Sequence, residues 1–186
     1  MPHYKIRTLL ILLAVGRGEY RMLISDYTIA HEGIEWETAL RTWSWLIPNE
    51  FTHWIVSRFA DLYVVTLDDS IHQLLIGEGT FTKVAENRAD FAQKIDNPDT
   101  ANDWLMIPLV DQLVAAGMSL QAGQCYGFRV PPMLGGEYSV RNCVPIAITD
   151  YLGAYGSIHE QLRDVSEGTQ VVLKPIDLPK KVRDVP

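Results

Sequence analysis

The sequence QCYGFRVPPMLGGEY, residues 124–138, places the strongest constraints on the backbone of this chain. It begins with a short run of strand-forming residues, 125–130. Pro131-Pro132 follows, and because proline has no backbone N–H, a central strand must end there or lie at a sheet edge. Gly135-Gly136 then permits a turn with positive φ. We therefore predict a strand, a Pro-Pro break, a Gly-Gly turn and a second extended run that begins at Glu137.

Upstream of this stretch, the sequence predicts short strands that follow one another through tight turns. Residues 62–66 and 71–76 are rich in β-branched and apolar residues, and the turn formers Asp68-Asp69-Ser70 separate them. The turn Gly77-Glu78-Gly79 then leads to a third run at residues 81–84. Three consecutive strands joined in this way predict an antiparallel meander.

Before the meander, apolar residues recur at helical spacing. Trp36, Leu40 and Trp43 share one face of a helix that we predict over residues 34–46. A second helix is predicted to start at Pro48, with an apolar stripe made of Phe51, Trp54, Ile55 and Phe59. The four tryptophans between positions 36 and 54 are expected mainly in the core, because aromatic residues dominate buried area, with a ligand-stacking surface as the alternative.

Three further helices are predicted after the meander. Asn87 is a typical N-cap for a helix that reaches Ile95. Pro108 fits the first turn of another helix, which ends before Gly117. A third helix is predicted over residues 149–162, with Thr149 or Asp150 as its N-cap.

Strands are also predicted on either side of this last helix, at residues 143–148 and, after a turn at 166–168, at residues 170–173. Within the helix, Gly153 and Gly156 each cost about 1 kcal/mol relative to alanine. Glycines at those positions indicate close packing against a neighbouring element.

Hairpin-connected strands with helices gathered between them predict an α+β fold, with mostly antiparallel sheet and short helices packed on it. The break at residues 97–99, Asn-Pro-Asp, is the best boundary between two halves, 22–97 and 98–175, which we expect to share one core. Residues 1–21 form an N-terminal extension of undecided status, and residues 176–186 are expected to be a loose tail.

Composition excludes several classes of protein. Aliphatic, aromatic and cysteine residues make up 47% of the 186 residues, which is enough for a substantial core. The formal net charge is −7, from 16 basic and 23 acidic residues. An acidic chain is poorly suited to nonspecific binding of nucleic acid or anionic membranes, which requires clustered Lys and Arg. It is compatible with a basic protein partner.

The N-terminus contains an apolar run at residues 9–15, preceded by Lys5 and Arg7. This run has some likeness to a signal peptide but is far too short to span a bilayer. An appended strand or helix, or a natural start at Met22, explains it equally well. We expect a cytoplasmic protein.

No motif in the sequence specifies catalysis or a cofactor. None of the five histidines has the spacing of a zinc-binding helix, and His159 is expected to be half-buried and hydrogen-bonded. Cys125 and Cys143 are expected to be buried free thiols. The turn at residues 77–79 lacks the lysine and the third glycine of phosphate-binding loops, and there is no G-x-S-x-G. We therefore predict no enzyme activity, no metal and no cofactor.

Several separated motifs nevertheless resemble a bacterial family. The run CYGFRVPPMLGGEY, followed by Val140, Asn142 and then SIHEQL, is similar to the C-terminal domain of immunity proteins that protect against DNase toxins of the type VI secretion system. Upstream, WLIPNEF, RFADLYVVTLDDSIHQLLIGEGTF and NDWLMIPLV resemble the GAD-like half that commonly precedes this domain. The resemblance runs from Met22 to Lys174 and offers no catalytic residues. One departure lies at residues 142–145, where Pro145 is expected to kink a strand or place it at a sheet edge.

The resemblance implies a protein that binds and neutralises a cognate toxin, expected to be a basic DNase, without cofactor or catalysis. From exposure and charge, we predict that the contacts include acids around the meander: Asp68, Asp69, Glu78, Glu86 and Asp90. The alternative is a regulatory domain that binds a small molecule or nucleotide, with the tryptophan-rich segment as its pocket wall. The sequence leaves the oligomeric state open.

Overall fold

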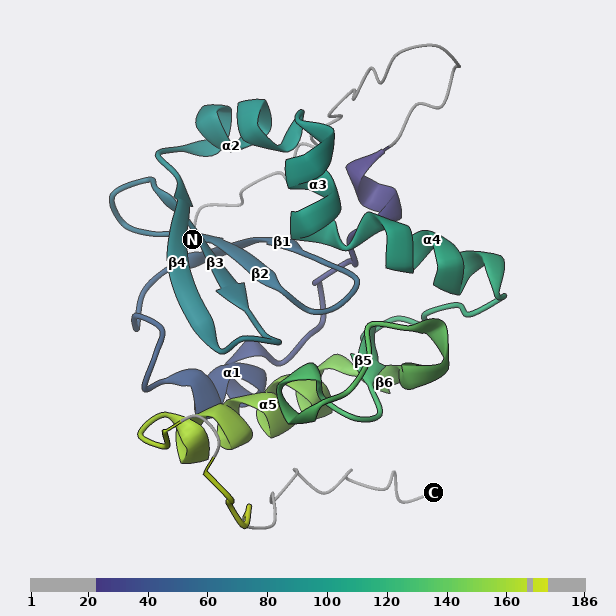
Figure 1. Ribbon diagram of the computed structural model, residues 1–186. Helices are drawn as coiled ribbons and strands as arrows, with labels where there is room; N and C mark the ends of the chain where they lie inside the picture. Colours follow the sequence, from purple (N-terminus) through teal and green to yellow (C-terminus); the bar gives the residue numbers. More distant parts are fainter. Residues whose placement is uncertain (1–22, 167–168, 174–186) are drawn as a thin grey trace, which may run out of the picture.

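The computed structural model describes residues 23–166 and 169–173 and consists of two antiparallel sheets with helices packed around them (Figure 1). The larger sheet has four strands in the order β1-β2-β3-β4, and the smaller pairs β5 with β6. The α+β prediction is thereby confirmed. The strands are β1 (Thr52–Val56), β2 (Leu62–Val65), β3 (Ile71–Leu75), β4 (Thr80–Ala85), β5 (Gln124–Phe128) and β6 (Cys143–Ala147).

Five α-helices and four short 3-10 helices accompany the strands in the described part of the chain. The α-helices are α1 (Trp36–Leu40), α2 (Arg88–Ile95), α3 (Pro98–Leu105), α4 (Ile107–Ala115) and α5 (Ile148–Leu162). The 3-10 helices are η1 (Ile24–Asp26), η2 (Arg41–Trp43), η3 (Pro132–Leu134) and η4 (Val140–Asn142). In Figure 1, α2 and α3 lie on one side of the larger sheet and α1 and α5 on the other.

Strand β2 lies at the centre of this layered arrangement, and all four of its residues are buried. Because successive strand residues face opposite ways, Leu62 and Val64 join the cluster that contains α1 and α5 residues. Tyr63 and Val65 join the cluster that contains residues of α2 and α3. The continuous apolar run LYVV is thus explained by helices on both faces.

The side-chain caps of α2 and α3 are as the sequence chemistry requires. The Asn87 side chain accepts hydrogen bonds from the backbone N–H groups of Ala89 and Asp90. Asn97 does the same for α3, with Pro98 in its first turn. The segment 97–99 was predicted only as a break, so α3 was missed although its cap and proline were visible.

Helix α5 packs closely on the segment that contains α1 and η2. A Cβ atom at Gly156 would lie 2.3 Å from Thr42 Oγ1 and 2.8 Å from Trp43 Nε1, so only glycine fits without a shift. Trp43 is fully buried and donates from Nε1 to the Leu152 carbonyl at 2.8 Å. At Gly153, by contrast, an added Cβ would meet no atom within 4 Å. Close packing was predicted for both glycines, and it holds for Gly156.

The helix predicted to begin at Pro48 is wrong, because residues 52–56 form strand β1. The sequence THWIV is β-branched and aromatic, and it pairs with β2 through a register shift between His53 and Ile55. The apolar spacing at 51, 54, 55 and 59 fits a strand followed by a loop as well as a helix. The predicted three-stranded meander therefore has a fourth strand.

The extended run predicted to begin at Glu137 is wrong, because no strand forms there, whereas the strand predicted at residues 143–148 is confirmed as β6. The intervening loop is closed by the Asn142 side chain, whose Oδ1 accepts from the Val130 N–H at 3.0 Å. Its Nδ2 donates to the carbonyls of Val130 and Glu137, each at 2.9 Å. Gly136 is required there because a Cβ atom would lie 1.8 Å from the Val130 carbonyl oxygen.

Of the remaining predictions, some are confirmed, one is wrong and others are not tested. Both cysteines are buried free thiols, as expected. The predicted strand at residues 170–173 is wrong, since this segment has no regular secondary structure. Residues 1–21 and the tail at 176–186 lie outside the described residues. The proposed division at residue 97 stays a prediction, and each of the three core clusters combines residues from both sides of it.

Candidate functional site

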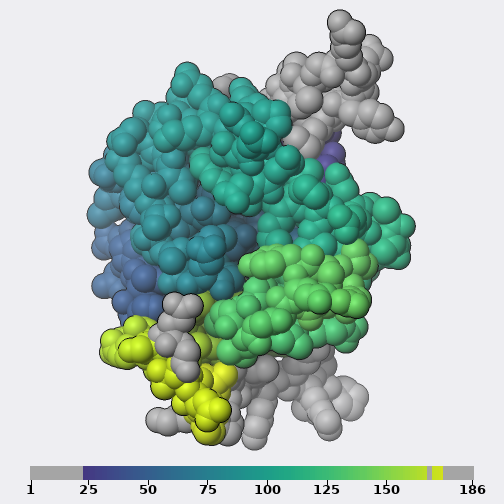
Figure 2. Space-filling model, viewed as in Figure 1, coloured from purple at the N-terminus to yellow at the C-terminus, as the bar shows by residue number. Residues whose placement is uncertain are grey.

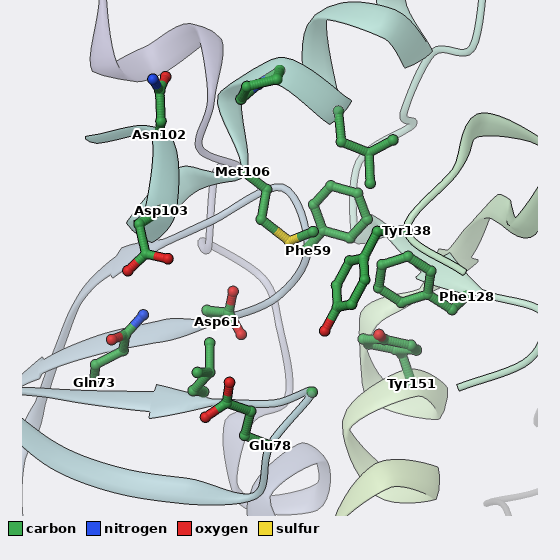
Figure 3. Close-up of a pocket in the computed structure, with 14 residues that line it drawn as sticks. Phe59, Asp61, Gln73, Glu78, Asn102, Asp103, Met106, Phe128, Tyr138 and Tyr151 are labelled. Carbon is green, nitrogen blue, oxygen red and sulfur yellow. The ribbon is translucent and has the colours of Figure 1, made fainter. Parts of the chain in front are cut away.

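A cavity of about 350 Å³ lies where the two sheets and the α3–α4 junction meet (Figure 3). Figure 2 shows this side of the molecule, where the green segment that contains β5 and β6 abuts the teal helices. The residues that line the cavity are Phe59, Asp61, Gln73, Leu75, Gly77, Glu78, Asn102, Asp103, Met106, Pro108, Leu109, Phe128, Tyr138 and Tyr151.

The cavity contains the buried carboxyl group of Asp61, whose residue is 4% exposed. The preceding turn positions Asp61, because Ser57 Oγ accepts a hydrogen bond from the Asp61 N–H at 3.0 Å. One carboxyl oxygen, Oδ1, accepts from the Ile76 N–H at 2.9 Å. The other, Oδ2, has only a long contact of 3.4 Å from the Ser57 hydroxyl.

Burial raises the pKa of Asp61 to about 7, with a smaller contribution from the negative charge of Glu78. Among the described residues that line the cavity, three are carboxylic acids, Asp61, Glu78 and Asp103, and none is basic. The site therefore contains a buried carboxyl group without a counter-charge.

Next to Asp61, the side of the cavity formed by the larger sheet contains a hydrogen-bonded polar group. Gln73 is 7% exposed and donates from Nε2 to the Tyr63 hydroxyl at 2.9 Å. That hydroxyl in turn donates to the Trp104 carbonyl at 2.7 Å. Within the described residues, the Gln73 amide oxygen accepts no hydrogen bond. It is a second acceptor, carried by a buried residue that lines the cavity.

Aromatic rings form the opposite wall. Phe59 and Phe128 stack with centroids 5.3 Å apart, and Tyr138 meets the edge of Phe128 at 5.2 Å. In Figure 3 the Tyr138 hydroxyl points toward the space between Asp61 and Glu78. Burial and the charges of Glu78 and Asp61 raise the pKa of Tyr138, so its hydroxyl stays protonated at neutral pH.

Helix α5 packs against the turn that contains Glu78. The ring of His159 lies against this turn, and a Cβ atom at Gly79 would lie 2.4 Å from His159 Nδ1. His159 Nε2 lies 3.0 Å from the Ile76 carbonyl, an acceptor, so Nε2 carries the proton. His159 is partly buried and bonded to this carbonyl, which confirms the expectation of a hydrogen-bonded, half-buried histidine, and burial lowers its pKa.

The five acids predicted as contacts fall into two groups. Asp68 and Asp69 lie in the β2–β3 turn, and Glu86 and Asp90 lie near the start of α2 at the same end of the sheet, where Arg88 bridges to Asp69 at 3.3 Å. Glu78 lies in the β3–β4 turn at the other end, on the cavity rim.

The four acids at the β2–β3 end of the sheet already form hydrogen bonds and ion pairs with neighbouring residues. Asp68 Oδ1 accepts from the hydroxyls of Thr66 and Ser70, each at 2.7 Å, and these bonds hold the Asp68 pKa below its usual range. Basic partners lie close to two others: Lys83 contacts Glu86 at 2.5 Å, and Lys94 contacts Asp90 at 3.0 Å. With Arg88, three cations thus accompany these four acids.

The sequence reasoning missed Asp61 and Asp103. A signal for Asp61 was present, because an acidic residue inside the apolar run FADLYVV must either be buried or interrupt it. No comparable signal marks Asp103, which is exposed on α3 and reaches the cavity only through the fold.

The tryptophan-rich segment is largely structural. Trp43 is fully buried, and Trp54 packs on Phe91 with centroids 5.0 Å apart. Trp36 stacks on His53 at 4.4 Å and lines a second, more open groove. The alternative that this segment forms a ligand pocket stays a prediction.

Other kinds of site were sought in the described residues. They contain no group of three His, Cys, Asp or Glu side chains arranged to hold a metal ion. Burial raises the pKa of Cys125, and it raises that of Cys143 to about 11, so both remain thiols at neutral pH. None of the described helices combines the length and apolarity needed to cross a membrane.

Comparison with solved structures finds a partial likeness. The crystal structure of Atu4351 from Agrobacterium tumefaciens aligns with a TM-score of 0.47 and 19% sequence identity. The alignment covers 64% of this chain and 60% of that chain, less than two thirds of either. A search of curated proteins finds no match.

A family model matches within the chain. Residues 85–159 match the model described as T6SS immunity protein Tdi1, C-terminal, where T6SS is the type VI secretion system. The match runs from the end of β4 into α5 and contains eight of the fourteen residues that line the cavity. Residues 85–159 of this chain are therefore similar to the C-terminal domain of the type VI secretion immunity protein Tdi1.

Proposed function

We propose that this protein is an immunity protein that binds a cognate type VI secretion toxin and neutralises it by protein–protein contact, without catalysis or a cofactor. The observation that carries this proposal is the match of residues 85–159 to the immunity family. An immunity protein needs a surface complementary to its toxin more than it needs a reactive group. Protonated thiols and a cavity lined by acids fit that requirement.

We further propose that the toxin is a DNase with a basic surface. A nuclease must present positive charge to the phosphate backbone of its substrate. The net charge of −7 on this chain is complementary to such a surface, and charge complementarity speeds association and excludes wrong partners. An acidic partner seated on that surface would also block access of DNA.

The contact residues are proposed to come from the acids predicted around the meander, in the two groups that the fold separates. Among the described residues, Glu78 has no basic partner at the cavity rim, whereas Asp68, Asp69, Glu86 and Asp90 are accompanied by Lys83, Arg88 and Lys94. We therefore expect Glu78 to contribute more per charge, because the other four are partly neutralised before the partner arrives.

The direct test uses the toxin encoded by the neighbouring gene, made with and without this protein. We expect the two to co-purify, and plasmid cleavage by the toxin to stop at a one-to-one ratio. A neighbouring toxin that cleaves DNA unhindered and does not bind this protein would overturn the proposal. Cleavage of another substrate, blocked by this protein, would overturn only the DNase assignment.

Charge reversal then locates the contact. Glu78→Lys is compared with Asp69→Lys in the same complex, and we expect the former to weaken binding more. Equal affinity of both variants and the unaltered protein would exclude these acids from the interface.

A further inference from the structure

The acidic cavity has the composition of a receptor for a positively charged side chain. It combines a buried carboxyl group, Asp61, with carboxylates at the rim from Glu78 and Asp103. Stacked aromatic rings, Phe59 and Phe128, form the facing wall. Carboxylates opposite aromatic faces attract a cation from two sides, through charge and through the ring quadrupole.

Two buried residues that line this space carry polar groups with unused hydrogen-bonding capacity. The Asp61 Oδ2 atom has only the 3.4 Å contact from the Ser57 hydroxyl, whereas a carboxylate oxygen can accept two good bonds. The amide oxygen of Gln73, a residue 7% exposed, accepts no bond from the described residues. Both groups are acceptors, so the missing partner is a hydrogen-bond donor.

The size and opening of the cavity also limit the occupant. A volume of about 350 Å³ lies at the low end of the range for small-ligand pockets, about 300–1,000 Å³. The rim contains Tyr138, which is 59% exposed, and the loop beyond it exposes Leu134 and Val130. Exposed apolar and aromatic residues next to a deep polar pocket are typical of a protein–protein contact around an anchor residue.

We propose that this cavity is the socket for an arginine side chain of the partner protein, held by Asp61, Glu78 and Asp103 against the Phe59–Phe128 wall. The choice of partner rests on the proposed function. Arginine fits better than lysine because its planar guanidinium offers five donors and stacks on aromatic rings. The exposed rim residue Tyr138 would pack on the anchor and help to exclude water from it.

Occupation of the socket must be linked to ionisation of Asp61. A guanidinium group favours the charged carboxylate, so binding releases a proton when Asp61 is protonated beforehand. Affinity is expected to increase by about tenfold between about pH 5.5 and pH 8. The other groups whose charges act on Asp61 or respond to it are Glu78, Tyr63, Tyr138, Tyr151 and Cys125, of which only Glu78 is a carboxyl group.

The first test needs no toxin. Nα-acetyl-arginine methylamide is titrated into the isotopically labelled full-length protein, with the citrulline analogue, a neutral isostere, as the control ligand. We expect amide shifts at Glu78, Phe128 and Tyr138 with the arginine compound alone, and tighter binding at higher pH. Equal shifts with citrulline, or none with arginine, would overturn the socket.

Two matched pairs of substitutions separate the effect on arginine binding from any effect on folding. Glu78→Gln with Asp103→Asn removes two charges from exposed residues of the socket, and Glu50→Gln with Glu160→Gln removes two from exposed residues elsewhere. We expect the first pair to weaken arginine binding by at least about tenfold and the second to leave it unchanged. Equal effects of the two pairs would show a general charge effect and overturn the assignment.

The second test uses the toxin complex and separates this inference from the proposed function. Loss of toxin affinity in the Glu78→Gln, Asp103→Asn variant, but not in the control pair, supports the proposal that the toxin supplies the arginine. Unchanged toxin affinity would show that the toxin does not place an arginine in the socket. A toxin that never binds the unaltered protein overturns the proposed function, while the arginine titration still decides whether the socket exists.

Discussion

At the scale of single residues, the protonation of Asp61 is the feature with the clearest energetic consequence. Its pKa is raised from an ordinary value of 3.8 to about 7 by burial. The folded state therefore binds the Asp61 proton more tightly than the unfolded chain does. The resulting stabilisation of the folded state is complete below about pH 3.8 and is lost as the pH rises through 7. The shift corresponds to roughly 4 kcal/mol between the two limits.

Replacement of Asp61 by asparagine should remove this dependence. We expect the free energy of unfolding of the unaltered protein to fall, relative to that of Asp61→Asn, by up to roughly 4 kcal/mol between about pH 4 and pH 8. Urea unfolding at several pH values measures the difference. Parallel curves for the two proteins would show that Asp61 is not buried as described.

The Asn142 side chain closes the loop that joins β5 to β6. It satisfies both the N–H and the carbonyl of Val130 and also bonds the Glu137 carbonyl. Asn142→Asp replaces two donors by an acceptor and leaves carbonyl oxygens unpaired, which costs about 1–3 kcal/mol. The unfolding midpoint in urea should fall accordingly. Arg141→Gln, at a neighbouring exposed residue, is the control; it removes only the exposed ion pair with Glu137, which contributes at most about 1 kcal/mol, and should change the midpoint less.

At the scale of elements, the two glycines of α5 offer a matched comparison. Gly156→Ala places a methyl group against Thr42 and Trp43, and overpacking of this kind costs about 1–3 kcal/mol, partly offset by the helix preference of alanine. Gly153→Ala meets no neighbour and should stabilise the helix by up to about 1 kcal/mol. Thermal unfolding distinguishes the two, and equal shifts would contradict the packing of α5.

The elements that the sequence predicted correctly are those with local signals. Helix α2 begins at its Asn87 cap, and the β2–β3 hairpin turns at the aspartates, because a few neighbouring residues decide each. Strand β1 was predicted as a helix because its apolar spacing fits both periods, and only pairing with β2 decides between them. The extended run predicted from Glu137 is replaced by a loop that Asn142 closes by reaching back to Val130, a contact across twelve residues.

The candidate site was harder to predict than the fold. Four of the five acids that the sequence marked as exposed lie on exposed turns or bends, Asp90 lies half-buried in the first turn of α2, and only Glu78 lines the cavity. Its companions come from distant parts of the chain: Asp61 before β2, and Asp103 on α3. A composite site of this kind requires the tertiary structure, since no spacing in the sequence brings these three residues together.

At the scale of the whole molecule, the three core clusters cross the proposed boundary at residue 97. Trp43 reports on one cluster and Trp104 on another. If the halves share one core, unfolding is a single cooperative transition. Tryptophan fluorescence and far-ultraviolet circular dichroism should then give coincident urea curves. Two separated transitions would show that the halves unfold independently.

The contact between His159 and the Gly79 turn has a consequence for the kinetics of recognition. Because helix α5 holds this turn from within, the rim of the cavity keeps its shape before any partner arrives. Little ordering entropy then remains to be lost on binding. For a partner that binds at this rim as proposed, we expect association to be governed by diffusion and electrostatic steering, and to slow as added salt screens the rim charges.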